Sequence, residues 1–130
     1  MLIAAALGVL LAGLSWAAHA DNCDHVRNSY DAVHCNNKMY VNADNELNKN
    51  YQELQSKLST QQKSILKHSQ LVWIKNRDQS CSGESNVGTV IYTVCQLHKT
   101  QERNAWLRER LRECKTKIGR ASCRERVLRL

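Results

Sequence analysis

None of the 130 residues is proline, and only five are glycine. All-β sandwiches and barrels need these residues at regular intervals to form their hairpins, so the sequence argues against a turn-rich β fold. The chain is 42% hydrophobic and 24% charged, a balance that does not suit a disordered acidic or basic tail. At this length the sequence predicts one small, basic, helical domain.

Hydrophobic residues recur at helical spacing from near Ser29 or Tyr30 onward. Successive apolar positions are three or four residues apart, which places them on one face of a helix. The residues of this stripe are Met39, Ala43, Leu47, Tyr51, Leu54 and Leu58. The pattern predicts a first helix of several turns.

Two further helices are expected after the first. The second follows a pair of suitable N-cap residues, Ser59 and Thr60, and runs to about residue 78. The third runs from about residue 89 to near residue 114. A loop that contains Gly83 and Gly88 is predicted between them. The expected fold is therefore all-α, a small three-helix antiparallel domain braced by disulfides.

The first twenty residues have the features of a secretory signal peptide. Residues 1–20 are apolar and rich in small side chains, and they end in Ala18-His19-Ala20, which fits the A-x-A cleavage rule. The segment lacks the basic residues usual at the start of such a peptide, and no lipidation motif precedes Cys23. We expect cleavage after Ala20 and a soluble periplasmic or secreted product with no remaining transmembrane helix.

The other end of the chain has an unusual sequence. Residues 118–127 read IGRASCRERV, which resembles the translation of a common DNA sequencing adapter. The adapter carries AG before that stretch, and the codon of Lys117 can supply these two bases. We therefore expect residues 118–130 to be a non-native, adapter-derived tail and residues 21–117 to be the helical domain. The alternative is a natural basic tail.

Cysteine usage indicates covalent bracing of the domain. Residues 21–117 contain five cysteines, and an exported chain of this kind is expected to form disulfides and leave one odd thiol. Pairing of Cys81 with Cys95 would close a helical hairpin, and pairing of Cys23 with Cys35 would hold the N-terminal segment on the first helix. Four cysteines allow three connectivities, and spacing does not select one. Under this hypothesis Cys114 is free or paired with a cysteine of a missing native C-terminus.

Discontinuous strings in the chain resemble a known domain. They are NADNELNKNY at 42–51, LKHSQLVWIKNRDQSC at 66–81, and Cys95 followed by Leu97, Thr100 and Arg103. Their order and spacing resemble the lysozyme inhibitor LprI-like family from Cys23 to about Leu111. That family consists of exported bacterial helical domains, many of uncharacterised function, and takes its name from a lipoprotein that inhibits lysozyme. The resemblance implies lysozyme as a partner.

Several matched residues combine polar groups with positions on or beside the apolar stripes. Asp44, Gln70, Arg77 and Arg103 have side chains that can form paired, hydrogen-bonded contacts between helices. One interpretation is an interhelical polar clamp, and the other is a ligand-binding site. Trp73 lies on the same expected helix face as Gln70 and Arg77, which favours a position in the core.

Several classes of function find no support in the sequence. No nucleophile motif, phosphate-binding glycine loop or C-x-x-C pair occurs, and the histidines are not at ligand spacing. We therefore predict no enzyme activity, no metal and no cofactor. Glutamates at 102, 109 and 113 interrupt the basic residues of the third helix, so nucleic acid is not an expected partner.

Two classes of binding protein remain. The first is an inhibitor that blocks lysozyme by docking a disulfide-braced surface on it. Residues 82–87 are the candidate inhibitory loop, with Glu84, Ser85 and Asn86 as its polar contacts. The second is a periplasmic structural or interaction module that binds an acidic envelope polymer or another envelope protein. Residues 21–117 carry fifteen Lys or Arg and eleven Asp or Glu, a balance that suits an acidic partner.

Overall fold

A computed structural model describes residues 23–115 and 123 of the chain. A short 3₁₀-helix, η1 (Cys23–His25), precedes three long helices and one β-hairpin. The expected signal peptide and nearly all of the expected adapter-derived tail lie outside the described residues. Among the described helices, none is long and apolar enough to cross a membrane.

Helix α1 (Ser29–Gln55) begins where the sequence predicts. Asn28 is its N-cap, because the Asn28 side-chain oxygen accepts a hydrogen bond from the Asp31 backbone N–H at 2.9 Å. The helix ends before Leu58, the last residue of the expected stripe. Leu58 is nevertheless buried, because the turn after α1 carries its side chain into the core.

Helix α2 (Thr60–Ser80) starts with a capping box. The Gln62 backbone N–H donates to Ser59 Oγ at 3.4 Å, and the Gln62 side chain accepts from the Ser59 backbone N–H at 3.1 Å. This local arrangement stops α1 from continuing and fixes the start of the second helix. The chain therefore reverses over the few residues between Gln55 and Thr60.

The segment after α2 differs from the sequence prediction. Strands β1 (Ser82–Ser85) and β2 (Gly88–Ile91) form an antiparallel hairpin where a plain loop was expected, so the fold is mostly helical but not purely all-α. Helix α3 (Thr93–Cys114) consequently begins four residues later than predicted. The physical reason is local: Gly88 adopts a φ of 114°, which lets the chain reverse, and the β-branched residues that follow it favour a strand.

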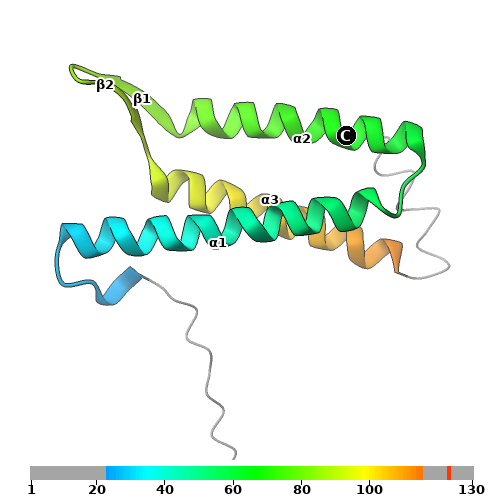
Figure 1. Cartoon of the computed structure of the whole chain (residues 1–130), viewed down its shortest axis with the longest axis horizontal. Helices are drawn as coiled ribbons and strands as arrows, with labels where there is room; N and C mark the ends of the chain where they lie inside the picture. The colour runs from blue at the N-terminus through cyan, green and yellow to red at the C-terminus, as the bar shows by residue number, and fades with distance from the viewer. Residues whose placement is uncertain (1–22, 116–122, 124–130) are drawn as a thin grey trace, which may run out of the picture.

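Each long helix runs antiparallel to the one before it, and the hairpin extends from the end of the bundle where α2 gives way to α3 (Figure 1). Helices α1 and α3 approach each other closely along their lengths, whereas the backbone of α2 lies further from both. Long side chains span this larger distance. The arrangement sets the position of the polar groups described below.

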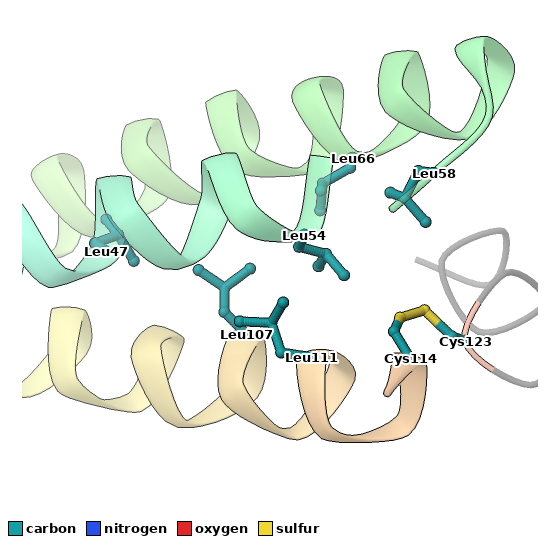
Figure 2. Packing of buried hydrophobic residues seen from close by; sticks show 8 residues of the cluster. All are labelled: Leu47, Leu54, Leu58, Leu66, Leu107, Leu111, Cys114 and Cys123. Atoms are coloured by element: carbon teal, nitrogen blue, oxygen red, sulfur yellow. A yellow bond between two sulfur atoms is a disulfide. The ribbon is translucent and has the colours of Figure 1, made fainter. Parts of the chain in front are cut away.

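Leucines from all three helices form the core. They point into the space between the helices in Figure 2, and each fully buried leucine contributes roughly 1.5–3 kcal/mol relative to an exposed one. The core leucines are Leu47, Leu54, Leu58, Leu66, Leu107 and Leu111. This cluster lies in the half of the bundle away from the hairpin.

Three disulfides brace the structure. Cys23 pairs with Cys35, and Cys81 pairs with Cys95 across the base of the hairpin. The third bond joins Cys114 at the end of α3 to Cys123. This last bond differs from the hypothesis that Cys114 is free or pairs with a missing native residue. Cys123 lies buried against the leucine core.

Candidate functional site

A polar cluster joins the three helices around Arg77. This α2 side chain is only 8% exposed, and its Nη1 lies 3.6 Å from Asp44 Oδ1 on α1. Its Nε donates to Asp78 Oδ1 at 2.9 Å, and its Nη1 donates to Thr100 Oγ1 on α3 at 3.3 Å. Of the two arginines that the sequence offers for an interhelical clamp, Arg77 and Arg103, the structure places Arg77 against Asp44. A charged group at this depth is stabilised by these paired contacts.

Arg103 links α3 to α2 at a second level of the cluster. Its Nε donates to Gln70 Oε1 at 2.9 Å, and its Nη2 donates to Ser69 Oγ at 3.0 Å. Both partners are neutral. Among the described residues no carboxylate lies within ion-pair distance of Arg103, although the residue is only 9% exposed.

Aromatic rings alternate with these guanidinium groups. Arg77 lies 5.6 Å from the Tyr40 ring centroid and 5.1 Å from that of Trp73. Arg103 lies 5.7 Å from the Trp73 centroid and 4.0 Å from that of Trp106. Cation–π contacts of this kind are worth about 0.5–2 kcal/mol each, more where water is excluded. The half-buried Trp73 packs against the leucine core, as expected, and also connects Arg77 with Arg103.

Two of these groups have shifted proton affinities. Burial, and then the positive charge of Arg110, lower the pKa of the Arg103 guanidinium to about 10. Arg103 is therefore still a cation at neutral pH, but a poorly solvated one. Burial also raises the pKa of the Tyr40 phenol. Both shifts have desolvation as their largest cause, so water is partly excluded from these two side chains.

A second buried polar pair was not identified from the sequence. Asn104 on α3 donates to the Ala43 carbonyl at 2.9 Å and accepts from the Asn50 side chain at 3.3 Å. Both asparagines are buried, in the tightly packed interface of α1 and α3. Their spacing from core leucines could have identified them in the sequence. Asn50 is three residues after Leu47, and Asn104 is three before Leu107, so each lies on the buried face of its helix.

The residues of the candidate inhibitory loop lie in the hairpin that follows α2 (Figure 1). Glu84 Oε1 accepts a hydrogen bond from Thr89 Oγ1 at 3.0 Å. Ser85 Oγ donates to the Gly88 carbonyl at 2.9 Å and accepts from the Val87 N–H at 3.3 Å. Two of the three predicted contact residues thus hold the hairpin in shape, while Asn86 lies at its turn.

The base of the hairpin is fixed by close packing as well as by the disulfide. A side-chain carbon at Gly83 would lie 2.6 Å from the Tyr92 hydroxyl, so the ring of Tyr92 covers this glycine. The Tyr92 backbone N–H donates to the Cys81 carbonyl at 2.7 Å, which extends the strand pairing to the Cys81–Cys95 bond. Val87 at the tip is 94% exposed. The hairpin is therefore a braced element with an apolar, accessible tip.

Other apolar side chains near the hairpin are also exposed. They come from β2, from the N-cap of α3 and from its first turn, and they are Val90, Ile91, Tyr92 and Val94. Neighbouring residues of a strand point to opposite faces, so these side chains lie on both sides of the hairpin, and accessible apolar groups of this kind are typical of protein-binding surfaces. We refer to Val87 together with these four residues as the hairpin surface.

The basic face of α3 is partly neutralised. Arg108 forms an ion pair with Glu46 on α1, and Arg112 forms one with Glu109 one turn earlier. Exposed pairs of this kind add little stability, but they reduce the charge available to an acidic partner. Among the described residues, no group of three or more His, Cys, Asp or Glu side chains is placed to hold a metal ion.

The fold and its bonds define a class: a small helical domain braced by disulfides, with a hairpin that extends from one end of the bundle. Residues 21–107 match the family profile described as Lysozyme inhibitor LprI, so the chain belongs to this family. The match confirms the resemblance found in the sequence. No curated protein and no solved structure matches the chain. The disulfides and the family both fit a protein that works outside the cytoplasm.

Proposed function

We propose that this protein is an exported binding module that inhibits lysozyme by docking the hairpin surface on the enzyme. The observation that carries the proposal is the hairpin itself, which combines a disulfide at its base with an accessible apolar tip. Membership of the lysozyme inhibitor family supplies the class of partner. The inhibitor would act by covering the enzyme, with no chemical step of its own.

Pre-organisation supports docking through the hairpin. Each rotamer-rich side chain immobilised on binding lowers the affinity by about 0.5–1.5 kcal/mol, so an already ordered element loses less. The bonds of Glu84 and Ser85 within the hairpin order it before any contact is made. Asn86 and Val87 then remain as the groups that can enter a cleft.

Electrostatics limits the approach to the enzyme. Many animal lysozymes are strongly basic, and this chain is basic too, so long-range attraction is absent. Glu84 is the one acidic residue of the two strands and offers local complementarity. Affinity for a basic lysozyme should therefore hold or rise as salt screens the net repulsion. An acidic envelope polymer, the alternative partner, would instead bind more weakly at high salt.

The experiment is an inhibition assay with several lysozymes and a targeted pair of substitutions. Asn86→Ala with Val87→Ala removes the tip side chains but keeps the bonds made by Glu84 and Ser85. We expect inhibition to weaken by about tenfold or more, because central contacts dominate such interfaces. The thermal unfolding temperature should not change.

The matched control truncates an exposed apolar residue outside the hairpin. Leu71→Ala changes an accessible side chain in the middle of α2 and should leave inhibition intact. Full inhibition by a folded Asn86/Val87 variant would refute docking through the hairpin. If the unsubstituted protein inhibits no lysozyme but binds an acidic polymer in a salt-sensitive manner, the envelope-binding alternative takes its place.

A further inference from the structure

A cavity of about 570 Å³ opens between α2 and α3. One side of α2, from Ser64 to Asn76, forms most of its wall, and Arg103 lines it from α3. None of its lining residues belongs to the hairpin. This volume lies within the range of pockets that hold small organic molecules.

Arg103 places a positive charge without a carboxylate partner at the wall of this cavity. Its guanidinium has five N–H groups, and two of them donate, to Gln70 and Ser69. The other three have no partner among the residues that the structure describes. Nη1, which carries two of these groups, is not sealed from solvent, so an anion that enters the cavity can replace water as their acceptor and pair with a poorly solvated cation.

The geometry restricts how an anion can approach. Trp106 and Trp73 lie over the guanidinium, at 4.0 and 5.7 Å from their ring centroids, and they limit access to its faces. The unpaired N–H groups lie in the guanidinium plane, where a carboxylate can accept two parallel hydrogen bonds. Ile65 and Val72 add apolar surface to the cavity wall.

We propose that this cavity binds a small organic carboxylate with an apolar body, and that Arg103 receives the carboxylate group. The apolar part lies against Ile65, Val72 and the Trp73 edge, while Ser64 and His68 provide polar contacts at the wall. The site goes beyond lysozyme inhibition and does not rest on it. A lysozyme assay and a carboxylate-binding assay therefore fail independently.

The test is an NMR titration of the folded full-length chain with benzoate, using benzamide as the neutral ligand of the same shape. We expect saturable shifts of the Arg103 Nε–H and Trp73 indole N–H signals with benzoate. Benzamide should bind about tenfold more weakly or worse, because it cannot pair with the cation. Equal binding of the two compounds, or no saturable shift with benzoate, would overturn the proposal.

A pair of neighbouring substitutions tests the location. Val72 lines the cavity and is 44% exposed, whereas Leu71 beside it is 56% exposed and does not line the cavity. Val72→Glu places a carboxylate of the chain itself near Arg103 and should weaken benzoate binding about tenfold or more. Leu71→Glu adds the same charge to the same helix and should leave binding unchanged. Equal weakening by both variants would show a general charge effect and refute the cavity as the site.

The source of the carboxylate is distinguished by two sugars. N-acetylmuramic acid carries a lactyl carboxylate that N-acetylglucosamine lacks, and the two share the same ring. Saturable binding of the first alone would identify a cell-wall sugar acid as the ligand class. Binding of benzoate with neither sugar would identify a free, less bulky carboxylate. Both results support the proposal, and failure of all carboxylates contradicts it.

Discussion

The carboxylate of Asp44 on α1 lies 3.6 Å from Nη1 of Arg77 on α2 and joins the two helices at the level of Trp73. The two partners differ in environment: the Arg77 side chain is 8% exposed, and that of Asp44 is 40% exposed. The arginine is the member that depends on the contact. Arg77 also donates hydrogen bonds to Asp78 and Thr100, so its partners come from all three helices.

Removing Asp44 should therefore have a moderate effect. We expect Asp44→Ala to lower the free energy of unfolding by about 1 kcal/mol, because Arg77 keeps its bonds to Asp78 and Thr100. Arg77→Ala should lower it by about 3 kcal/mol or more, since it opens a cavity and leaves the buried Thr100 hydroxyl without its partner. Urea unfolding measures both.

Glu46 on the same helix provides the control for Asp44. It pairs with Arg108 at the surface, and Glu46→Ala should cost about 0.5 kcal/mol or less. A cost for Asp44→Ala no greater than that of the control would show that the contact with Arg77 does not support the fold. If binding were lost at the same time, Asp44 would belong to a binding surface.

The starts of α1 and α2 were predictable because their signals are local. Asn28 and Ser59 cap α1 and α2 through bonds to residues three positions away, so the starts of both helices can be read from short strings. The hairpin was not predicted, because the spacing of Val90, Val94 and Leu97 satisfies a helical period as well. The glycine at 88 marked a turn but not the strand that follows it.

The sequence predicted which residues form the polar cluster, but not which of them contact one another. Polar residues beside apolar stripes indicate interhelical contacts, yet the partner depends on how far one helix slides along another. Asp44 meets Arg77 rather than Arg103 for this reason. The bond from Asn104 to the Ala43 carbonyl shows the same limit, because its acceptor lies 61 positions away and is a backbone group that every residue possesses.

Arg103 provides a test of guanidinium geometry. Arg103→Lys keeps the charge but cannot bond to Gln70 and Ser69 together while it lies over Trp106. We expect the free energy of unfolding to fall by about 2 kcal/mol. Arg108→Lys, in an exposed ion pair, is the matched control and should change it by less than about 0.5 kcal/mol. Equal stability of the two variants would show that the hydrogen bonds of the Arg103 guanidinium to Gln70 and Ser69 do not stabilise the fold.

The Cys81–Cys95 bond should stabilise the whole domain and also hold the hairpin in its ordered conformation. Its closed loop contains the whole hairpin, and in the chain-entropy model a loop of this length contributes roughly 3 kcal/mol. Cys81→Ser with Cys95→Ser should therefore lower stability and speed amide hydrogen exchange at Thr89 and Val90. The Cys23→Ser with Cys35→Ser variant, which opens a loop of similar length, should leave hairpin exchange unchanged. Equal exchange in both variants would show that the hairpin orders without its disulfide.

The last prediction concerns the end of the chain, where we propose that residues 118–130 are an adapter-derived tail. The Cys114–Cys123 bond begins at the last residue of α3, so the loop that it closes contains no residue of the three helices. This bond therefore restricts the conformational entropy of the tail, not that of the unfolded bundle.

Truncation removes the packing of the buried Cys123 side chain, which is worth about 1 kcal/mol to the bundle. A chain that ends at Lys117 and carries Cys114→Ala, which places no polar group in the core, should melt within about 8 °C of the full chain. The source gene should show different codons after Lys117. A drop of more than about 15 °C, or the same tail in genomic DNA, would show that these residues are native.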